Sequence, residues 1–287
     1  MKAGFIGLGS LGKAMVKRLV AEGVELVVWN RTAEKAIGLG VEFEETPAML
    51  ASRADVIFLS LFDSEAVEAV LADRDGLLEG PCQEKIVIDT TTNQVDAVLK
   101  FYGLVAAKGG VYVEAPVLGS VPQAERGELT FLLGVDAGAI GRVGSYLENL
   151  ARTVFRFEEP GLATKVKLIE SMVLGSFMVT LGEALGLGEA VGMPRARVLD
   201  ILAAGAGNSA LMTAKKRKLE KEDFSPELAS TTLHKDLRYL EELAASLRWS
   251  SIQSRSTTDL FARAISGGEG GLDFSAICKA ITRLRND

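Results

Sequence analysis

The stretch Gly7-Leu8-Gly9-Ser10-Leu11-Gly12 has the spacing G-x-G-x-x-G and constrains the fold of this chain more than any other feature. It directly follows Ala3–Ile6, a run typical of a buried strand, and directly precedes a helical pattern with Leu11, Met15 and Leu19 on its apolar face. In a strand–turn–helix unit the first glycine permits a tight turn, the second lets the backbone approach a pyrophosphate, and the third lets the helix pack close to the strand. The helix N-terminus then offers N–H groups and a positive dipole end to phosphates. We therefore predict that Gly7, Leu8, Gly9, Ser10, Leu11 and Gly12 bind a dinucleotide, in preference to forming a glycine-rich turn of a nucleotide-free sheet.

Short apolar runs alternate with helical patterns through about residue 157, which is the order that a wound parallel sheet requires. The runs are apolar on both sides, as strands covered by helices on both faces must be. The predicted strands are Ala3–Ile6, Leu26–Trp29, Val56–Leu59, Ile86–Asp89, Val111–Val113, Thr130–Leu133 and Thr153–Phe157. The predicted fold class is α/β, with a Rossmann-type doubly wound parallel sheet and a second, all-α domain.

The acidic turn Glu158-Glu159-Pro160-Gly161 separates this pattern from a helical remainder. Residues Val166, Ile169, Val173 and Phe177 recur at spacings of three and four, which predicts a helix over residues 163–190 with these side chains on its buried face. The other predicted segments are helices over Pro194–Ala204, Thr231–Ser246 and Ser275–Leu284, and a loop at Gly267–Gly271. The sequence thus predicts a dinucleotide-binding domain over residues 1–160 and an all-helical domain over residues 161–287.

Charge and cysteine content exclude several classes of function. The net charge of -6 argues against a nucleic-acid partner, because phosphate-backbone affinity needs clustered lysine and arginine. The two cysteines, Cys82 and Cys278, show neither a C-x-x-C pair nor a Cys/His metal spacing. We therefore expect no metal, no disulfide and a reducing, cytoplasmic location.

We also expect neither a signal peptide nor a membrane span. Basic residues interrupt the first 20 positions, where a signal peptide needs an unbroken apolar stretch. The most apolar later stretch, Met172–Met193, carries Glu183 and Glu189, which favours a buried helix of a soluble protein over a membrane helix.

The end of the second predicted strand bears on the choice of cofactor. An NAD-preferring site places a carboxylate there to bond the ribose hydroxyls, whereas this chain has Asn30-Arg31-Thr32. Asn30 does not repel a 2′-phosphate, and Arg31 can bond one as a fork. The sequence therefore favours NADP, with NAD as the alternative cofactor. The alternative without a cofactor-binding role is that Arg31 is a solvated loop residue and Thr32 caps the next helix.

Hydride transfer is the reaction that a dinucleotide-binding glycine loop indicates. His234 is the only histidine, and no G-x-S-x-G elbow supplies a nucleophile, so hydrolase chemistry is disfavoured. The cofactor would carry the difficult chemistry, and the protein would supply orientation and a proton.

Four further stretches make the chain resemble the β-hydroxyacid dehydrogenases, a family that includes 3-hydroxyisobutyrate dehydrogenase and the glyoxylate and succinic semialdehyde reductases. The stretch from Glu114 to Gly127 is similar to the family's substrate loop, and Asp89-Thr90-Thr91-Thr92-Asn93 is similar to its D-M-S-T loop. The segment from Gly161 to Ser171 resembles its G-x-G-x-x-x-K-x-x-x-N helix, and Lys235-Asp236 falls on its later K-D pair. The resemblance covers essentially the whole chain.

The resemblance implies a role for each matching residue. Lys167 is the implied catalytic residue, whose ammonium would stabilise and protonate a carbonyl oxygen as this oxygen gains negative charge. Without the family resemblance, Lys167 would be interpreted as an ordinary surface lysine. Leu61, Thr92 and Lys235 are the further cofactor-binding residues that it implies. The implied substrate-binding residues are Thr92, Leu118, Gly119, Ser120, Ser171, Leu228 and Asp236. It also implies a small carboxylate-bearing substrate and pairing through the helical domain, as a homodimer or homotetramer.

Departures from the family pattern keep several functions open. Ser171 stands where the family has asparagine, Leu118 where it has a small polar residue, and Leu228 where the semialdehyde reductase branch has an aromatic residue. We expect an NADP-dependent reductase of small aldehyde acids. The alternatives are an NAD-dependent 3-hydroxyisobutyrate dehydrogenase, an imine reductase, and a dinucleotide-binding scaffold or sensor without catalysis.

Overall fold

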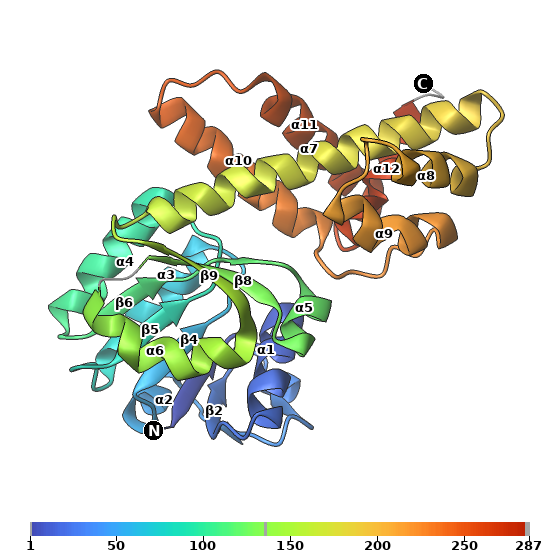
Figure 1. Cartoon of the computed structure of the whole chain (residues 1–287). Coiled ribbons are helices and arrows are strands. Elements are labelled where there is room, and N and C mark those ends of the chain that lie inside the picture. The colour runs from blue at the N-terminus through green and yellow to red at the C-terminus, as the bar shows by residue number, and fades with distance from the viewer. Residues whose placement is uncertain (1, 135–136, 285–287) are drawn as a thin grey trace. The chain divides into compact units, whose positions relative to one another are not determined.

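The computed structural model describes residues 2–134 and 137–284, with the side chains of residues 137–140 and 284 left aside. Packing divides the chain into two compact units, Met1–Lys167 and Leu168–Asp287 (Figure 1). The division falls inside a long helix, whereas the sequence predicts a domain boundary at the turn before it. Lys167 therefore packs with the first unit.

The first unit is built on a sheet whose central strands are parallel. Its order is β3-β2-β1-β4-β5-β6-β8-β7, with β9 paired to β8. The strands are β1 (Ala3–Ile6), β2 (Leu26–Trp29), β3 (Glu42–Phe43), β4 (Val56–Leu59), β5 (Ile86–Asp89), β6 (Val111–Glu114), β7 (Val117–Leu118), β8 (Leu129–Gly134) and β9 (Ala151–Phe157). The chain winds outward from β1 in both directions, which confirms the predicted doubly wound sheet.

The second half of the sheet is not wholly parallel. Strand β8 runs antiparallel to β6 and β7 and parallel to β9. The short strands β3 and β7 were not predicted, because two residues carry no readable alternation.

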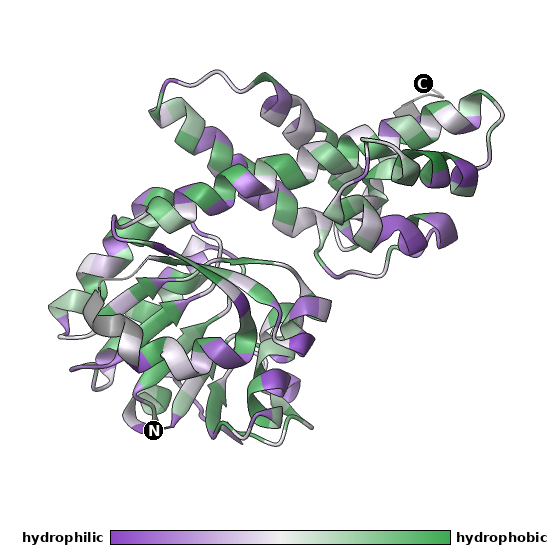
Figure 2. Ribbon diagram, in the orientation of Figure 1, coloured by the Kyte–Doolittle hydropathy of each residue, from purple (hydrophilic) through white to green (hydrophobic). Residues whose placement is uncertain are grey.

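Helices cover both faces of this sheet, as Figure 1 shows. Neighbouring strand residues point to opposite faces, so Phe5 packs with the residues of α1, α5 and α6, and Ile6 with those of α2, α3 and α4. The central strands β1, β4 and β5 are predominantly hydrophobic in Figure 2, as burial on both faces demands. The helices are α1 (Ser10–Ala21), α2 (Pro47–Arg53), α3 (Ser64–Ala72), α4 (Val95–Ala107), α5 (Val121–Arg126) and α6 (Ala137–Leu150).

The described part of the second unit consists of helices, apart from one isolated bridge between Ala229 and Asp273. This confirms the predicted all-α second domain. Its elements are α7 (Leu162–Ala190, which begins in the first unit), α8 (Arg195–Ala204), α9 (Ala210–Lys221), α10 (Ser230–Ser246), α11 (Ile252–Ala264), the π-helical turn η3 (Ile265–Glu269), the 3-10 turn η4 (Phe274–Ala276) and α12 (Ile277–Leu284). The prediction missed α9 and α11.

Two further predictions are wrong in detail. Part of the expected loop at Gly267–Gly271 lies in η3, which directly follows α11 and is kinked at Gly268, where φ is 94°. The stripe expected on the buried face of α7 is exposed: Ile169, Val173 and Phe177 are 50%, 45% and 48% accessible.

Helix α7 is apolar on more than one side, and packing selects the side with small residues. A Cβ on Gly175 would lie 3.1 Å from Thr257, and one on Gly182 would lie 2.8 Å from Ile281, so α11 and α12 approach this face closely. Periodicity identifies the helix but does not distinguish its two apolar faces. Within the described residues, α7 is also the one helix long and apolar enough to cross a membrane by length and composition, a test that core helices of globular proteins also pass.

Candidate functional site

The glycine loop between β1 and α1 contains two glycines that packing requires and one that it does not. A Cβ on Gly7, whose φ is 101°, would lie 2.2 Å from the Ser60 carbonyl oxygen, and one on Gly12 would lie 2.1 Å from the Gly7 oxygen. A Cβ on Gly9 would meet no atom of the described residues within 4 Å. Gly9 is the N-cap of α1 and brings no side chain to its first N–H groups. The open space over these donors fits a pyrophosphate.

Asn30 connects the glycine loop to the segment after β2. Its Oδ1 accepts a hydrogen bond from the Leu8 N–H at 2.8 Å, and its Nδ2 donates to the Thr32 carbonyl oxygen at 2.8 Å. The residue at the end of β2 is thus a neutral amide used to fix the two loops together. Arg31 is exposed beside it, and no described carboxylate pairs with this arginine.

The segments after β4 and β5 are also joined. The Leu61 N–H donates to Thr91 Oγ1 at 3.0 Å. Asp89, 1% exposed at the end of β5, accepts hydrogen bonds from the Thr91 N–H, Asn93 Nδ2 and the Tyr112 hydroxyl at 2.7–2.9 Å. Burial raises the pKa of Asp89, against the opposing effect of these bonds. Asp89 thereby shapes the loop that holds the half-buried Thr92.

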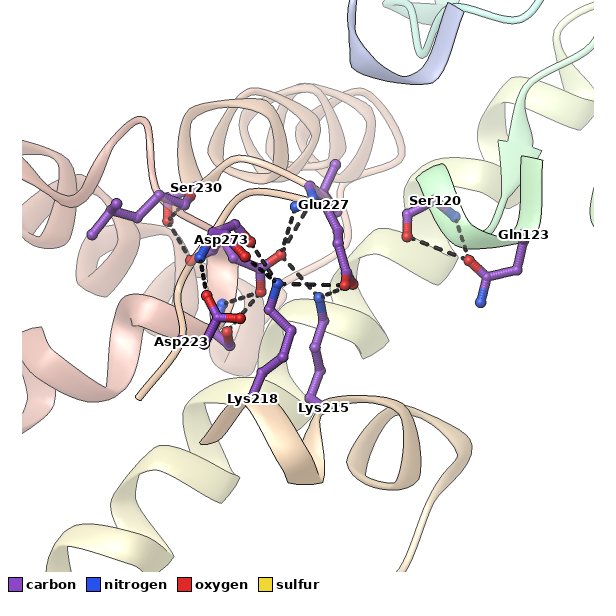
Figure 3. A network of polar contacts seen from close by, with 12 residues as sticks. Ser120, Gln123, Lys215, Lys218, Asp223, Glu227, Ser230 and Asp273 are labelled. Atoms are coloured by element: carbon purple, nitrogen blue, oxygen red, sulfur yellow. Dashed lines mark hydrogen bonds and ion pairs between the residues drawn. The ribbon is translucent and has the colours of Figure 1, made fainter. Parts of the chain in front are cut away.

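The predicted substrate loop contains a glycine with a left-handed backbone followed by a helix cap. Gly119 has φ 112°, and Ser120 is the N-cap of α5. Gln123 Oε1 accepts the Ser120 N–H at 3.0 Å and lies 3.4 Å from Ser120 Oγ (Figure 3). The Ser120 amide is therefore already bonded, and Leu118, in β7, is partly exposed. The sequence did not predict this capping role, which the structure assigns to Ser120.

Lys167 lies near the start of α7 and is 8% exposed, so its side chain is buried. Ser171 follows one turn later and is fully buried. Its hydroxyl donates to Asp236 Oδ2 at 3.3 Å. Within the second unit the structure thus brings together two of the residues predicted to bind substrate.

Asp236 lies on α10 beside Lys235. Lys235 Nζ is 3.0 Å from Asp236 Oδ1 and 5.0 Å from the Tyr239 ring centre. The Asp236 Oδ1 atom is buried and, among the described residues, accepts no hydrogen bond, although it forms this ion pair with Lys235. Buried oxygens are normally satisfied, and the charged partner of this one is the Lys235 ammonium.

Leu228 is held by a buried ionic network that the sequence did not indicate (Figure 3). Asp273, fully buried, accepts the backbone N–H groups of Glu227 and Leu228 at 3.1 and 3.3 Å. Lys215 Nζ lies 2.9 Å from Asp273 Oδ2 and 2.7 Å from Glu227 Oε2. These bonds fix the segment that leads into α10.

The described residues contain no group of three or more His, Cys, Asp or Glu side chains placed to hold a metal ion. Cys82 and Cys278 are buried thiols, and burial raises the pKa of Cys278 to about 12.

Two family models together match most of the chain. Residues 2–158 match the model described as the NAD binding domain of 6-phosphogluconate dehydrogenase. Residues 161–281 match the model described as NAD-binding of NADP-dependent 3-hydroxyisobutyrate dehydrogenase.

Individual relatives extend this likeness. Glyoxylate/succinic semialdehyde reductase 1 of Arabidopsis thaliana is 33% identical over 284 residues, which are 98% of this chain and 98% of that protein. Cytokine-like nuclear factor N-PAC of Gallus gallus is 32% identical over 282 residues, 97% of this chain, and the chain spans about half of its length, 51%. The solved structure of Psf3 in complex with NADP+ and 2-OPP has a TM-score of 0.88 at 26% identity, covering 97% of this chain and 99% of that one.

Proposed function

This chain belongs to the β-hydroxyacid dehydrogenase family, and from that premise we propose that it is an NADP-dependent reductase of a small carboxylate-bearing aldehyde, of the glyoxylate or succinic semialdehyde type. The family consists of oxidoreductases that act on CH–OH groups with a nicotinamide dinucleotide. The reverse reaction would oxidise the matching hydroxy acid. The observation that carries the proposal is that the first unit holds both an open glycine loop and a buried lysine, Lys167.

The residues of the first unit fit the binding of a dinucleotide. The N–H groups at the start of α1 would hold the pyrophosphate over Gly9. Leu61 and Thr92 belong to two segments that a hydrogen bond joins, so they would present one continuous wall to the cofactor. In the second unit, Lys235 is the residue expected to bind it.

Preference for NADP is supported by the amide at the end of β2. A carboxylate there would repel a 2′-phosphate, whereas Asn30 is neutral and its amide is used within the protein. Arg31 is exposed and could bond the phosphate with two N–H groups. An NAD-dependent 3-hydroxyisobutyrate dehydrogenase is the alternative that a cofactor comparison separates.

A bound nicotinamide dinucleotide would supply the hydride. Lys167 would donate a hydrogen bond to the substrate oxygen as this atom gains negative charge, and would then give it a proton. The Thr92 hydroxyl and the backbone at Gly119 would hold the substrate carboxylate. Gln123 accepts the Ser120 N–H at 3.0 Å and its hydroxyl at the longer distance of 3.4 Å, so Ser120 would bind the carboxylate through this hydroxyl only by giving up the longer bond.

A second candidate is a dinucleotide-binding protein without catalysis, and one observation favours it. The Ser171 hydroxyl donates a hydrogen bond to Asp236, so it is already used within the protein. The side chain is also shorter than the asparagine of the family pattern. Such a protein would bind NADPH and would oxidise it with none of the aldehyde acids.

We also propose that the chain forms a homodimer or a larger homo-oligomer in the cytoplasm. The exposed stripe on α7 supports this assembly, because Ile169, Val173, Phe177 and Leu187 are each at least 45% accessible and follow one line along the helix. A second copy of the chain would cover it.

The test is an NADPH- and NADH-oxidation screen over aldehyde acids with matched lysine variants. We expect Lys167→Ala to keep the Kd for NADPH and lose most of kcat. Lys165→Ala removes a neighbouring lysine that pairs with Glu159 at 3.3 Å, and should leave turnover unchanged. We expect Arg31→Ala to raise the KM for NADPH by about tenfold or more and to leave the KM for NADH unchanged. The reason is that the variant loses a charge-assisted hydrogen bond to the 2′-phosphate, worth about 1.5–3 kcal/mol. Preference of the parent protein for NADH, or full activity of Lys167→Ala, would contradict the proposal.

A further inference from the structure

Glu114, the last residue of β6, binds the start of α7 from across the first unit. Its side chain is fully buried. Oε1 accepts the Gly161 N–H at 2.6 Å, and Oε2 accepts the Thr164 N–H at 2.9 Å and the Thr164 hydroxyl at 2.5 Å. Three donors from one helical turn therefore converge on one carboxylate.

These contacts replace the cap that α7 lacks. The N–H of Lys165 donates to the Gly161 carbonyl oxygen, so Gly161 stands at the N-cap position. An N-cap side chain normally accepts an N–H two or three residues into the helix, but Gly161 has no side chain and has φ 82°. Glu114 takes that place from 47 residues away, and its negative charge suits the positive end of the helix.

The surroundings are shaped to admit this carboxylate. Gly134 of β8 lies opposite Glu114 in the antiparallel pair, and a Cβ there would fall 2.4 Å from Glu114 Cγ. Any side chain at position 134 would displace the glutamate. Burial raises the pKa of Glu114, against the bonds from Thr164 and Gly161, so its place is costly in free energy.

We propose that Glu114 is a positioning residue that fixes Lys167, and this inference rests on the role proposed above for that lysine. Thr164 precedes Lys167 by three residues, so the two share a face of the same helical turn. Clamping Thr164 and Gly161 to the end of β6 sets where the helix starts and how it is rotated. The Lys167 amine is thereby held at a defined place in the unit that contains the glycine loop.

The experiment replaces Glu114 by glutamine, which keeps the length of the side chain and removes its negative charge. We expect kcat to fall about tenfold to a hundredfold for Glu114→Gln, since a displacement of about 1 Å costs about that much, with the KM for aldehyde acid and the Kd for NADPH within twofold of the parent. In a Lys167→Ala background the same change should have no further effect, because it acts through the missing amine. An equal loss in both backgrounds would overturn the proposal.

Two readouts separate this inference from the proposed function. Amide hydrogen exchange over residues 161–167 should rise in Glu114→Gln, and labelling of Lys167 by an amine reagent should rise relative to Lys165 in the same molecules. If both are unchanged, Glu114 does not position the lysine, whatever the activity. If both rise while no aldehyde acid is reduced by the parent protein, the anchoring stands and the proposed reaction fails. Thr164→Val, which removes one donor and leaves the glutamate, should give the same changes to a smaller extent if Glu114→Gln does not fold, and no change in it would equally overturn the proposal.

Discussion

Replacement of Gly9 by alanine should separate cofactor binding from folding. Gly9 has φ -69° and ψ -177°, an extended backbone that alanine adopts without strain, and its added Cβ would meet no described atom within 4 Å. Gly→Ala changes at such positions stabilise a protein by about 0.4–1 kcal/mol, because they restrict the unfolded chain. The apo Gly9→Ala protein should therefore be as stable as the parent or slightly more so.

The same methyl group would occupy the space over the first N–H groups of α1. If it displaces one charge-assisted hydrogen bond to the pyrophosphate, the loss is about 1.5–3 kcal/mol. At about 1.4 kcal/mol per factor of ten, the Kd for NADPH should rise about 12- to 150-fold. Gly7→Ala and Gly12→Ala should instead destabilise the apo protein, since each Cβ would fall within 2.2 Å of a carbonyl oxygen.

The assay pairs urea unfolding of the apo protein with a fluorescence titration of NADPH. Gly103→Ala is the matched control, because Gly103 is an exposed glycine within α4 and its Cβ would also meet nothing within 4 Å. This control should gain about 0.5–1 kcal/mol and keep the Kd. The reasoning is refuted if Gly9→Ala binds NADPH as tightly as the parent, or if it unfolds as readily as Gly12→Ala.

Two further outcomes test the second unit. Burial alone would raise the pKa of Asp273, but the Lys215 ammonium and the hydrogen bonds from Ser275 and the Glu227 backbone hold this pKa below its ordinary value of 3.8. The carboxylate therefore stabilises the fold above pH 3.8, and this contribution is lost as the pH falls through the pKa of the folded state. Lys215→Met should accordingly cost about 3–5 kcal/mol of unfolding free energy at pH 7, by leaving a buried charge unpaired, and less at pH 3; an equal cost in urea titrations at both pH values would contradict this. Phe177→Asp should shift the mass measured by light scattering from that of an oligomer to that of a monomer. The control Leu99→Asp changes an equally exposed apolar residue of α4 and should leave the mass unchanged. A monomeric parent protein would contradict the proposed assembly.

The sequence predicted the parts of the fold that depend on local patterns. Runs that are apolar on both sides identified Ala3–Ile6, Leu26–Trp29, Val56–Leu59 and Ile86–Asp89 with the bounds that the structure has. Parallel strands covered by helices must be apolar on both faces, so this signal is strong. The exposed stripe on α7 shows its limit, because two apolar faces of one helix give the same periodicity and only the partner helices decide between them.

The candidate site was predictable where a motif lies within one segment. The glycine loop occupies six consecutive residues, and its chemistry follows from their order. The structure adds that, of the three glycines of the loop, Gly9 is the one that packing within the protein does not require to be glycine. The roles of Thr92, Leu118, Leu228 and the other residues implied by the family resemblance stay predictions.

What the sequence could not predict is how buried carboxylates hold these segments in place. Asp63 caps α3 by accepting the N–H of Ala66, three residues away, and such a cap can be read from local spacing. Glu114 does the same for α7 over 47–50 residues, and Asp273 binds the backbone before α10 over 45–46 residues. No periodicity connects such partners, since the contact exists only after the strands and helices have packed. In composition these glutamates and aspartates look like surface charges, yet once buried they must be bonded. A carboxylate that folding buries against distant backbone N–H groups therefore marks a segment whose position the fold has to specify, and in this chain the start of α7 is such a segment.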